Sequence, residues 1–258
     1  MLNLIHYLLI ALAFNLIMFI FAYRFKTDKL TDISYALTFI FLITLGFLTN
    51  NFSKLKFILF LMILLWAFRL GIFLFIRIRK TNKDRRFDSI RENFLKFFGF
   101  WFFQGITVWI ILLPSLVLFN SEGKISVFSW IGFAIWFIGL TIEIFSDLQK
   151  YQFNQSQSNK NNKKDGWIST GLWKYSRHPN YFGEILCWIG VYFFSFSSLT
   201  SIEKIFSLNS PIFISLLLIF VTGLPKLEEY ADKKWGRLKK YREYKRKTSK
   251  LVLWFQKK

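Results

Sequence analysis

The chain has 258 residues, of which 53% are hydrophobic and 21% aromatic, and its formal net charge is +20. Uncharged apolar runs of about 20 residues exclude an ordinary soluble domain and indicate membrane-spanning helices. The single cysteine, Cys187, excludes an intramolecular disulfide, and one cysteine with two widely separated histidines gives no support for a metal site.

Hydropathy predicts an all-α polytopic membrane protein with about seven transmembrane helices. We expect the whole chain, residues 1–258, to form a single transmembrane domain. The predicted spans cover residues 4–23, 33–48, 55–76, 97–119, 127–146, 181–196 and 211–224.

The basic residues are distributed unevenly among the loops. The loops at 24–31, 77–96, 147–179 and 226–258 hold 30 of the 35 lysine and arginine residues, and the alternate loops hold four. This asymmetry places the N-terminus outside and the C-terminus in the cytoplasm. The charge is explained by topology and by attraction to membrane lipids, so nucleic acid is not an expected partner. We expect an integral protein of a bacterial inner (plasma) membrane.

Three polar residues are predicted inside the spans and are assigned to a polar cavity for substrate. Arg69 lies midway through the third span, where a guanidinium needs a partner or a wet cavity, and Glu143 in the fifth span is the expected partner. A structural ion pair and a ligand-binding role both remain open. Gln104, in the fourth span, is also typical of a hydrogen bond between helices. Glu143 and Asp147 are four residues apart, and a cation or a shared ligand would relieve their repulsion.

Residues 171–184 form a cationic, aromatic turn that leads into the sixth span. Pro179 suits the first position of a helix, whose free N–H groups and positive dipole end favour an anion. One turn later, Asn180 and Glu184 share a helix face. The groups beside the proline are Lys174, Arg177 and His178. A basic interfacial turn that merely caps the helix is the alternative.

The basic tail from Lys226 onward is amphipathic and aromatic. It is predicted either to lie on the membrane surface, held by anionic lipid, or to fold back so that Tyr241 and Tyr244 close a cofactor pocket.

These patterns resemble the bacterial branch of the steroid 5-alpha-reductase family, the group labelled DUF1295. The resemblance extends from about Trp66 to the end, so residues 66–258 are expected to form the cofactor-binding region, preceded by N-terminal helices at 1–65. The motifs that carry it are Glu143-x-x-x-Asp147-x-Gln149-Lys150, Gly171-Leu172-Trp173-x-Tyr175-Ser176-Arg177-His178-Pro179-Asn180-Tyr181-Phe182-Gly183-Glu184, Gly223-x-Pro225-x-x-Glu228 and Tyr241-x-x-Tyr244-x-x-x-Thr248-Ser249.

The shorter Arg-His-Pro-Asn-Tyr core is similar to motifs in sterol C14 reductases, which use NADPH, and in isoprenylcysteine carboxyl methyltransferases, which use S-adenosylmethionine. The Phe182-Gly183-Glu184 continuation favours the reductases. The resemblance therefore implies a membrane-embedded, NADPH-dependent reductase of a C=C bond in a lipophilic, steroid- or isoprenoid-like substrate. The alternatives are a methyltransferase that uses S-adenosylmethionine on a membrane-embedded acceptor and a non-enzymatic lipid-binding protein.

The resemblance also implies a set of cofactor-binding residues. They are Asp147, Lys150, Trp173, Arg177, His178, Asn180, Tyr181, Glu184, Tyr241 and Tyr244. Arginine and lysine would bind phosphates, Trp173 could stack on a ring, and Asn180 and Glu184 could hold the carboxamide or ribose. The steroid reductases use a Tyr and a Glu of early helices as proton donors. Here the second and third spans contain Tyr35 but no Glu, so no catalytic residue is assigned.

Overall fold

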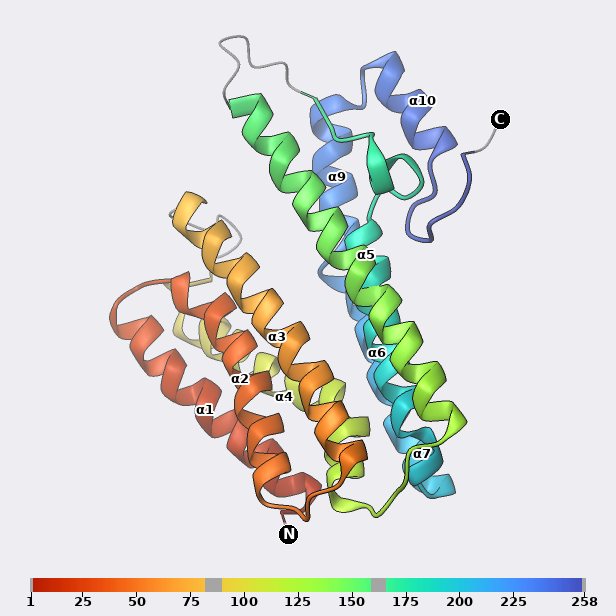
Figure 1. Ribbon diagram of the computed structural model, residues 1–258. Helices are drawn as coiled ribbons and strands as arrows, with labels where there is room; N and C mark the ends of the chain where they lie inside the picture. Colours follow the sequence, from red (N-terminus) through yellow and green to blue (C-terminus); the bar gives the residue numbers. More distant parts are fainter. Residues whose placement is uncertain (1, 82–89, 159–165, 257–258) are drawn as a thin grey trace. The chain divides into compact units, whose positions relative to one another are not determined.

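A computed structural model describes residues 2–81, 90–158 and 166–256 of the chain (Figure 1). The described residues are almost entirely helical, and their only strand-like pairing is an isolated parallel bridge between Ser176 and Ser249. Six helical stretches of the described residues are long and apolar enough to cross a membrane. Five are single helices, and the sixth, Ser201–Trp235, is made of several shorter helices in succession. The prediction of an all-α polytopic membrane protein is confirmed.

The helices follow the predicted spans closely at most of their starts. Their bounds are α1 Leu4–Arg24, α2 Lys29–Leu48, α3 Lys54–Thr81, α4 Phe94–Asn120, α5 Val127–Ser158, α6 Pro179–Ser195, α7 Ser201–Ser207, α8 Asn209–Leu216, α9 Leu224–Trp235 and α10 Lys239–Lys247, with 3₁₀ turns at Gly171–Lys174 and Phe196–Ser198 and a π turn at Leu217–Val221.

The number of spans depends on α6. This helix has 17 residues, so it is about 26 Å long at 1.5 Å per residue, a little shorter than a hydrocarbon core of about 30 Å. It is not one of the six candidate spans among the described residues. The count of seven and the orientation of the chain stay predictions.

By its internal contacts the chain forms two compact units. The first contains Met1–Trp130 and Val191–Ser210, and the second contains Ile131–Gly190 and Pro211–Lys258. Each is described by itself below, and the expectation of one transmembrane domain stays a prediction.

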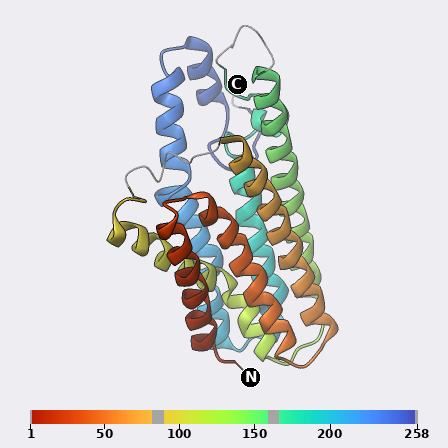
Figure 2. The same ribbon diagram turned by 90° about the vertical axis from the view of Figure 1, so that its left-hand side faces the viewer.

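The first unit is built on the bundle of α1 to α4 seen in Figures 1 and 2. Helix α1 packs against α2 and α4, and α2 packs against α3. Hydrogen bonds between buried polar side chains connect three of these helices: Asn15 donates to Thr38 (3.1 Å) and accepts from Gln104 (2.9 Å). Polar groups that face hydrocarbon must find partners within the protein, so this network fixes the register of α1, α2 and α4.

The second unit is built on the close packing of α5 against α6. A Cβ atom added at Gly183 would lie 2.6 Å from the carbonyl oxygen of Gly139 and 2.8 Å from the backbone nitrogen of Glu143. Only glycine therefore allows the two backbones to approach this closely, as small residues commonly do between membrane helices. The contact places the start of the second turn of α6 beside Glu143.

Helix α5 is longer than the sequence pattern indicates. Its predicted span ends at residue 146, and residues 154–166 are predicted as a flexible polar loop, but the helix continues to Ser158. Polar residues such as Gln149 and Lys150 are good helix formers, so the helix continues after its apolar stretch ends. Asp147 and Lys150 are therefore held on a rigid extension of α5. The rest of the expected loop, 159–165, lies outside the described residues.

Candidate functional site

The turn at Gly171–Lys174 is fastened to the extension of α5. Gly171 has a φ of +60°, which favours glycine, and a Cβ there would lie 2.5 Å from the side-chain amide of Gln149. That amide oxygen accepts a hydrogen bond from the backbone N–H of Leu172 (3.0 Å). The indole N–H of Trp173 donates to the carbonyl oxygen of Ser146 (3.0 Å). The turn is thus fixed on α5 before the chain enters α6.

Lys150 and Tyr244 contact Trp173 from different elements. The ammonium of Lys150 lies 4.9 Å from the centre of the Trp173 ring, within the range of a cation–π contact. The hydroxyl of Tyr244, on α10, donates to the carbonyl oxygen of Trp173 (2.7 Å). Trp173 is buried and therefore serves as an anchor, with Lys150 over the ring that we expected to stack on a cofactor.

The tail folds back onto the turn. Beside the Ser176–Ser249 bridge, the backbone N–H of Arg177 donates to the carbonyl oxygen of Ser249 (2.8 Å), and the Ser176 hydroxyl donates to the carbonyl oxygen of Leu251 (2.6 Å). Of the two arrangements predicted for the tail, the structure has the fold-back.

Glu228, in the first half of α9, joins the turn to the tail. One carboxylate oxygen lies 3.0 Å from Nη2 of Arg177 and 3.3 Å from Nζ of Lys245, and the other lies 2.9 Å from Nε2 of His178. The side chains of Glu228 and Arg177 are largely buried. Water screens such an ion pair weakly, so losing one partner is costly.

Lys245 extends this network to the end of α9. Its ammonium lies 2.6 Å from a carboxylate oxygen of Asp232, and its carbonyl oxygen accepts from Nη1 of Arg177 (2.7 Å). Since Glu228 and Asp232 are four residues apart, they share one face of α9. That face therefore holds both the Arg177–His178 turn and α10.

The environment of His178 favours a neutral imidazole. Burial lowers the pKa of His178 below its ordinary value, contact with Glu228 acts in the opposite direction, and the charges of Lys150 and Arg177 add to the lowering. Because a carboxylate only accepts hydrogen bonds, the neutral ring donates from Nε2 to Glu228 and keeps Nδ1 as an acceptor. The ring also stacks on Tyr181, with centroids 5.9 Å apart.

Trp167 gathers the aromatic side chains of α9 and α10 into a cluster. Its ring centroid lies 5.0 Å from that of Tyr241, 6.1 Å from Trp235 and 6.2 Å from Tyr244. Burial, with the nearby charges of Glu228 and Asp232, raises the pKa of Tyr241 to about 12. Burial also raises the pKa of Tyr244, so both tyrosines stay protonated.

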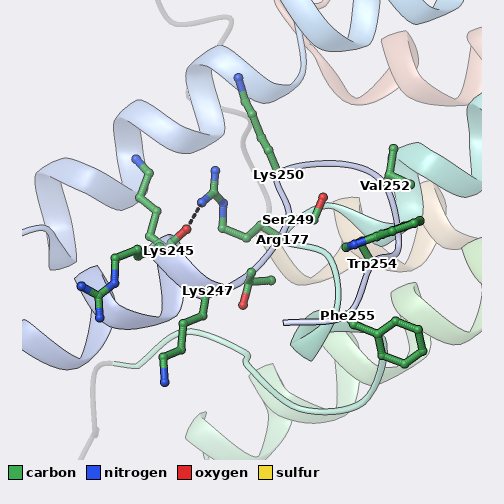
Figure 3. Close-up of a pocket in the computed structure, with 10 residues that line it drawn as sticks. Arg177, Lys245, Lys247, Ser249, Lys250, Val252, Trp254 and Phe255 are labelled. Atoms are coloured by element: carbon green, nitrogen blue, oxygen red, sulfur yellow. Dashed lines mark hydrogen bonds between the residues drawn. The ribbon is translucent and has the colours of Figure 1, made fainter. Parts of the chain in front are cut away.

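A basic pocket opens beside Arg177, with a volume of about 390 Å³. In Figure 3, Arg177 lies near its centre, Lys245 and Lys247 on one side, and Trp254 and Phe255 on the other. The pocket is lined by Arg177, Lys245, Arg246, Lys247, Thr248, Ser249, Lys250, Val252, Trp254 and Phe255.

The structure brings most of the expected cofactor residues together. Lys150, Trp173, Arg177, His178, Tyr181, Tyr241 and Tyr244 are joined by the contacts above. Asp147 is buried on α5 and directly follows Ser146, whose carbonyl oxygen receives the Trp173 indole. Asn180 and Glu184 are partly exposed on the first turns of α6. Among the described residues, the side-chain amide of Asn180 has no hydrogen-bond partner within the protein, so it is open to a ligand.

The residues assigned to a substrate cavity fall in different units. Arg69 and Gln104 belong to the first unit and Glu143 to the second, so the ion pair between Arg69 and Glu143 stays a prediction. Gln104 donates to Asn15 and, at 3.4 Å, to Ser34. It therefore makes the hydrogen bonds between helices that are typical of a glutamine in a span.

Glu228 is a residue of the candidate site that sequence reasoning left out, although it is part of a quoted motif. The available signal was the pair Glu228 and Asp232 on one helical face within a strongly basic tail. Trp167 and Lys245 had no comparable signal, because their roles depend on the fold-back. In the parts of the chain that the structure describes, no group of three or more His, Cys, Asp or Glu side chains could hold a metal ion.

Comparison with known proteins gives a family match over most of the chain. Residues 18–248 match the family described as "Protein of unknown function (DUF1295)". The chain is also 24% identical over 135 residues to "Uncharacterized protein C594.04c" of Schizosaccharomyces pombe, an alignment that covers 43% of this chain and 39% of the relative's length. The chain thus spans well under half the length of that curated relative. No solved structure matches. With its all-helical membrane fold and the match across residues 18–248, the chain belongs to the DUF1295 family.

Proposed function

We propose that this protein is an integral-membrane, NADPH-dependent reductase of a polarised C=C bond in a lipophilic steroid- or isoprenoid-like substrate. The proposal rests on the motif resemblance and on one observation above all. At the start of α6, the amide of Asn180, which has no hydrogen-bond partner among the described residues, closely follows the cationic Arg177 and the neutral imidazole of His178 in the chain. A helix N-terminus with a cationic arginine and a free amide suits a ligand that carries phosphates and a carboxamide.

The donor set fits a phosphorylated nucleotide. The Nε atom of Arg177 is buried and has no hydrogen-bond partner among the described residues. The buried indole N–H groups of Trp167 and Trp235 likewise lack an acceptor there. Buried donors without acceptors are costly, so an acceptor-rich ligand would lower the free energy of this region.

The residues of this chain would bind the cofactor and orient it. Lys150 and Arg177 would hold phosphate oxygens, Asn180 and Glu184 would fix an amide or ribose hydroxyls, and Glu228 would hold Arg177 and His178 in place. The nicotinamide cofactor supplies the hydride when bound. Glu228 already pairs with Arg177 and His178, so a phosphate would bind to the Nε side of Arg177 and to Lys150.

The charge distribution supports a cytoplasmic site. The turn and the folded-back tail belong to the two loops that the excess of basic residues assigns to the cytoplasm, where NADPH is available. We place the protein in a bacterial plasma membrane with this site facing inward.

A thermal-shift titration of the detergent-purified protein with NADPH, NADH and S-adenosylmethionine tests the proposal. A ligand at 100 times its Kd adds roughly 2.7 kcal/mol to the stability of the folded state. We expect NADPH to raise the melting temperature of the wild type and of Asn51→Ala, and to have no effect on Asn180→Ala. Asn51 is an exposed asparagine of the first unit and serves as the matched control.

Each other outcome contradicts either the reductase or the site proposed for its cofactor. A shift with S-adenosylmethionine alone would turn the search to methyl acceptors. An NADPH shift that survives in Asn180→Ala would place the nucleotide elsewhere. No shift with any of the three, in protein reconstituted with lipid, would favour a non-enzymatic lipid-binding protein.

A further inference from the structure

The pocket of Figure 3 has one basic wall and one apolar wall. Arg177 and Lys245 with three further cations give one wall a positive charge, and no acidic side chain among the described residues lines the pocket. The other wall is apolar, formed by Val252, Trp254 and Phe255. A ligand that fills the pocket would therefore combine an anionic group with an apolar part.

Much of the positive charge is not neutralised. Lys245 and Arg177 pair with acids of α9. Within the described ranges, Arg246, Lys247 and Lys250 form no ion pair, and all three are exposed. Several cations around one cavity attract a phosphate more strongly than the same cations spread over a surface, because each acts on it at short range. Ser249 adds a hydroxyl donor to the same wall.

The apolar wall is held in position although it is exposed. Trp254 and Phe255 are 66% and 81% exposed. The backbone N–H of Trp254 nevertheless donates to the carbonyl oxygen of Tyr175 (3.4 Å), and the ring of Phe255 stands edge-on to that of Tyr175, with centroids 6.4 Å apart. Large aromatic side chains fixed beside lysines are typical of the interface between a membrane and water.

The position of Arg177 in the chain places this pocket near the bilayer surface. Arg177 stands two residues before Pro179, the first residue of α6, which corresponds to the sixth predicted span. The pocket is therefore close to the level at which the chain enters the hydrocarbon, where phospholipid head groups lie.

We propose that this pocket binds the phosphate head group of an anionic phospholipid, with an acyl chain lying along Val252, Trp254 and Phe255. This inference does not depend on the cofactor proposal, because it needs neither a nucleotide nor a reaction, although both sites include Arg177. A bound lipid would connect the tail to the membrane and stabilise the fold-back that holds Glu228 against Arg177.

Lipid titrations of the full-length protein in a neutral detergent test this inference. Binding of dioctanoyl phosphatidylglycerol, dioctanoyl phosphatidylcholine and inorganic phosphate is measured by native mass spectrometry and by the shift in melting temperature. The test variant is the triple substitution Arg246→Gln, Lys247→Gln, Lys250→Gln. The matched control removes the same charge from exposed residues of α10 that do not line the pocket: Lys239→Gln, Lys240→Gln, Arg242→Gln.

We expect phosphatidylglycerol to bind well below the concentrations at which phosphatidylcholine or inorganic phosphate acts. The test variant should bind it about 10- to 100-fold more weakly, because each cation near an anionic head group contributes about tenfold or less. The control variant should bind phosphatidylglycerol at most about threefold more weakly than the wild type. Trp254→Ala should weaken the lipid about 10-fold and leave phosphate binding unchanged.

Three results would overturn the site. Equal losses in the test and control variants would mean attraction by net charge alone. Phosphate as effective as the lipid would identify a simple anion site. Unchanged lipid binding in both the test variant and Trp254→Ala would place the lipid elsewhere. The melting temperature of each variant without lipid shows that its fold is retained.

Discussion

Replacing Glu228 with Gln should weaken the docking of the tail on the turn. The substitution keeps the shape of the side chain and removes the charge that faces Arg177, His178 and Lys245. A Gln oxygen can still accept from His178, and Lys245 keeps Asp232, so the main loss is the buried pair with Arg177. Breaking a buried ion pair costs about 3–5 kcal/mol, and the remaining contacts reduce this to about 2–3 kcal/mol.

Hydrogen exchange measures this loss directly. Two amides report tail docking: that of Arg177, bonded to Ser249, and that of Trp254, bonded to Tyr175. If they exchange by local opening, a loss of about 2–3 kcal/mol speeds exchange about 30- to 160-fold.

Glu229→Gln is the matched control. The neighbouring glutamate pairs only with Lys233 among the described residues, and both side chains are more than 60% exposed, so this change should alter exchange about twofold or less. Equal exchange rates in the two variants would refute the role of Glu228 as the connection between turn and tail.

Three further changes test the packing and electrostatics of both units. Gly183→Ala should destabilise the protein by about 1–3 kcal/mol in thermal unfolding, since its Cβ meets backbone atoms of α5, whereas Gly99→Ala, where a Cβ meets nothing within 4 Å, should be neutral or stabilising. Because the pKa of His178 is lowered, its contribution to stability is present above pH 6.5 and declines as the pH falls through its folded-state pKa, so a His178→Gln variant should show a flatter stability profile below pH 6.5. Asn15→Leu should cost about 1–2 kcal/mol by removing the closer acceptor of the buried Gln104 amide and leaving only Ser34 at 3.4 Å, and an unchanged melting temperature would refute this.

The sequence predicts the fold class well because hydropathy reports directly on burial in lipid. It predicts helix ends poorly, as α5 shows. The apolar stretch ends near Ser146, but nothing in the next twelve residues stops a helix, so α5 continues to Ser158. Hydropathy locates the membrane boundary, whereas a helix ends where capping or chain-breaking residues require it.

The candidate site could be predicted only in part, because some of its residues are close in the sequence and others come together only in the fold. The residues around Pro179 share a short segment, so their types and spacing indicate an anion site without knowledge of the fold. Glu228 lies some 50 residues further on. Its effect depends on whether the tail folds back, and two tail arrangements were compatible with the same amphipathic pattern.

Acidic residues in a strongly basic tail offer a way to choose between such arrangements. A tail that lay flat on an anionic membrane would place Glu228 and Asp232 next to lipid phosphates, where like charges repel. Folded back, the same two acids neutralise Arg177 and Lys245 and leave Arg246, Lys247 and Lys250 facing outward. The two acids therefore determine which cations form ion pairs within the protein and which stay available for anionic lipid. On this reasoning the tail has two faces, one that completes the candidate site and one that contacts lipid.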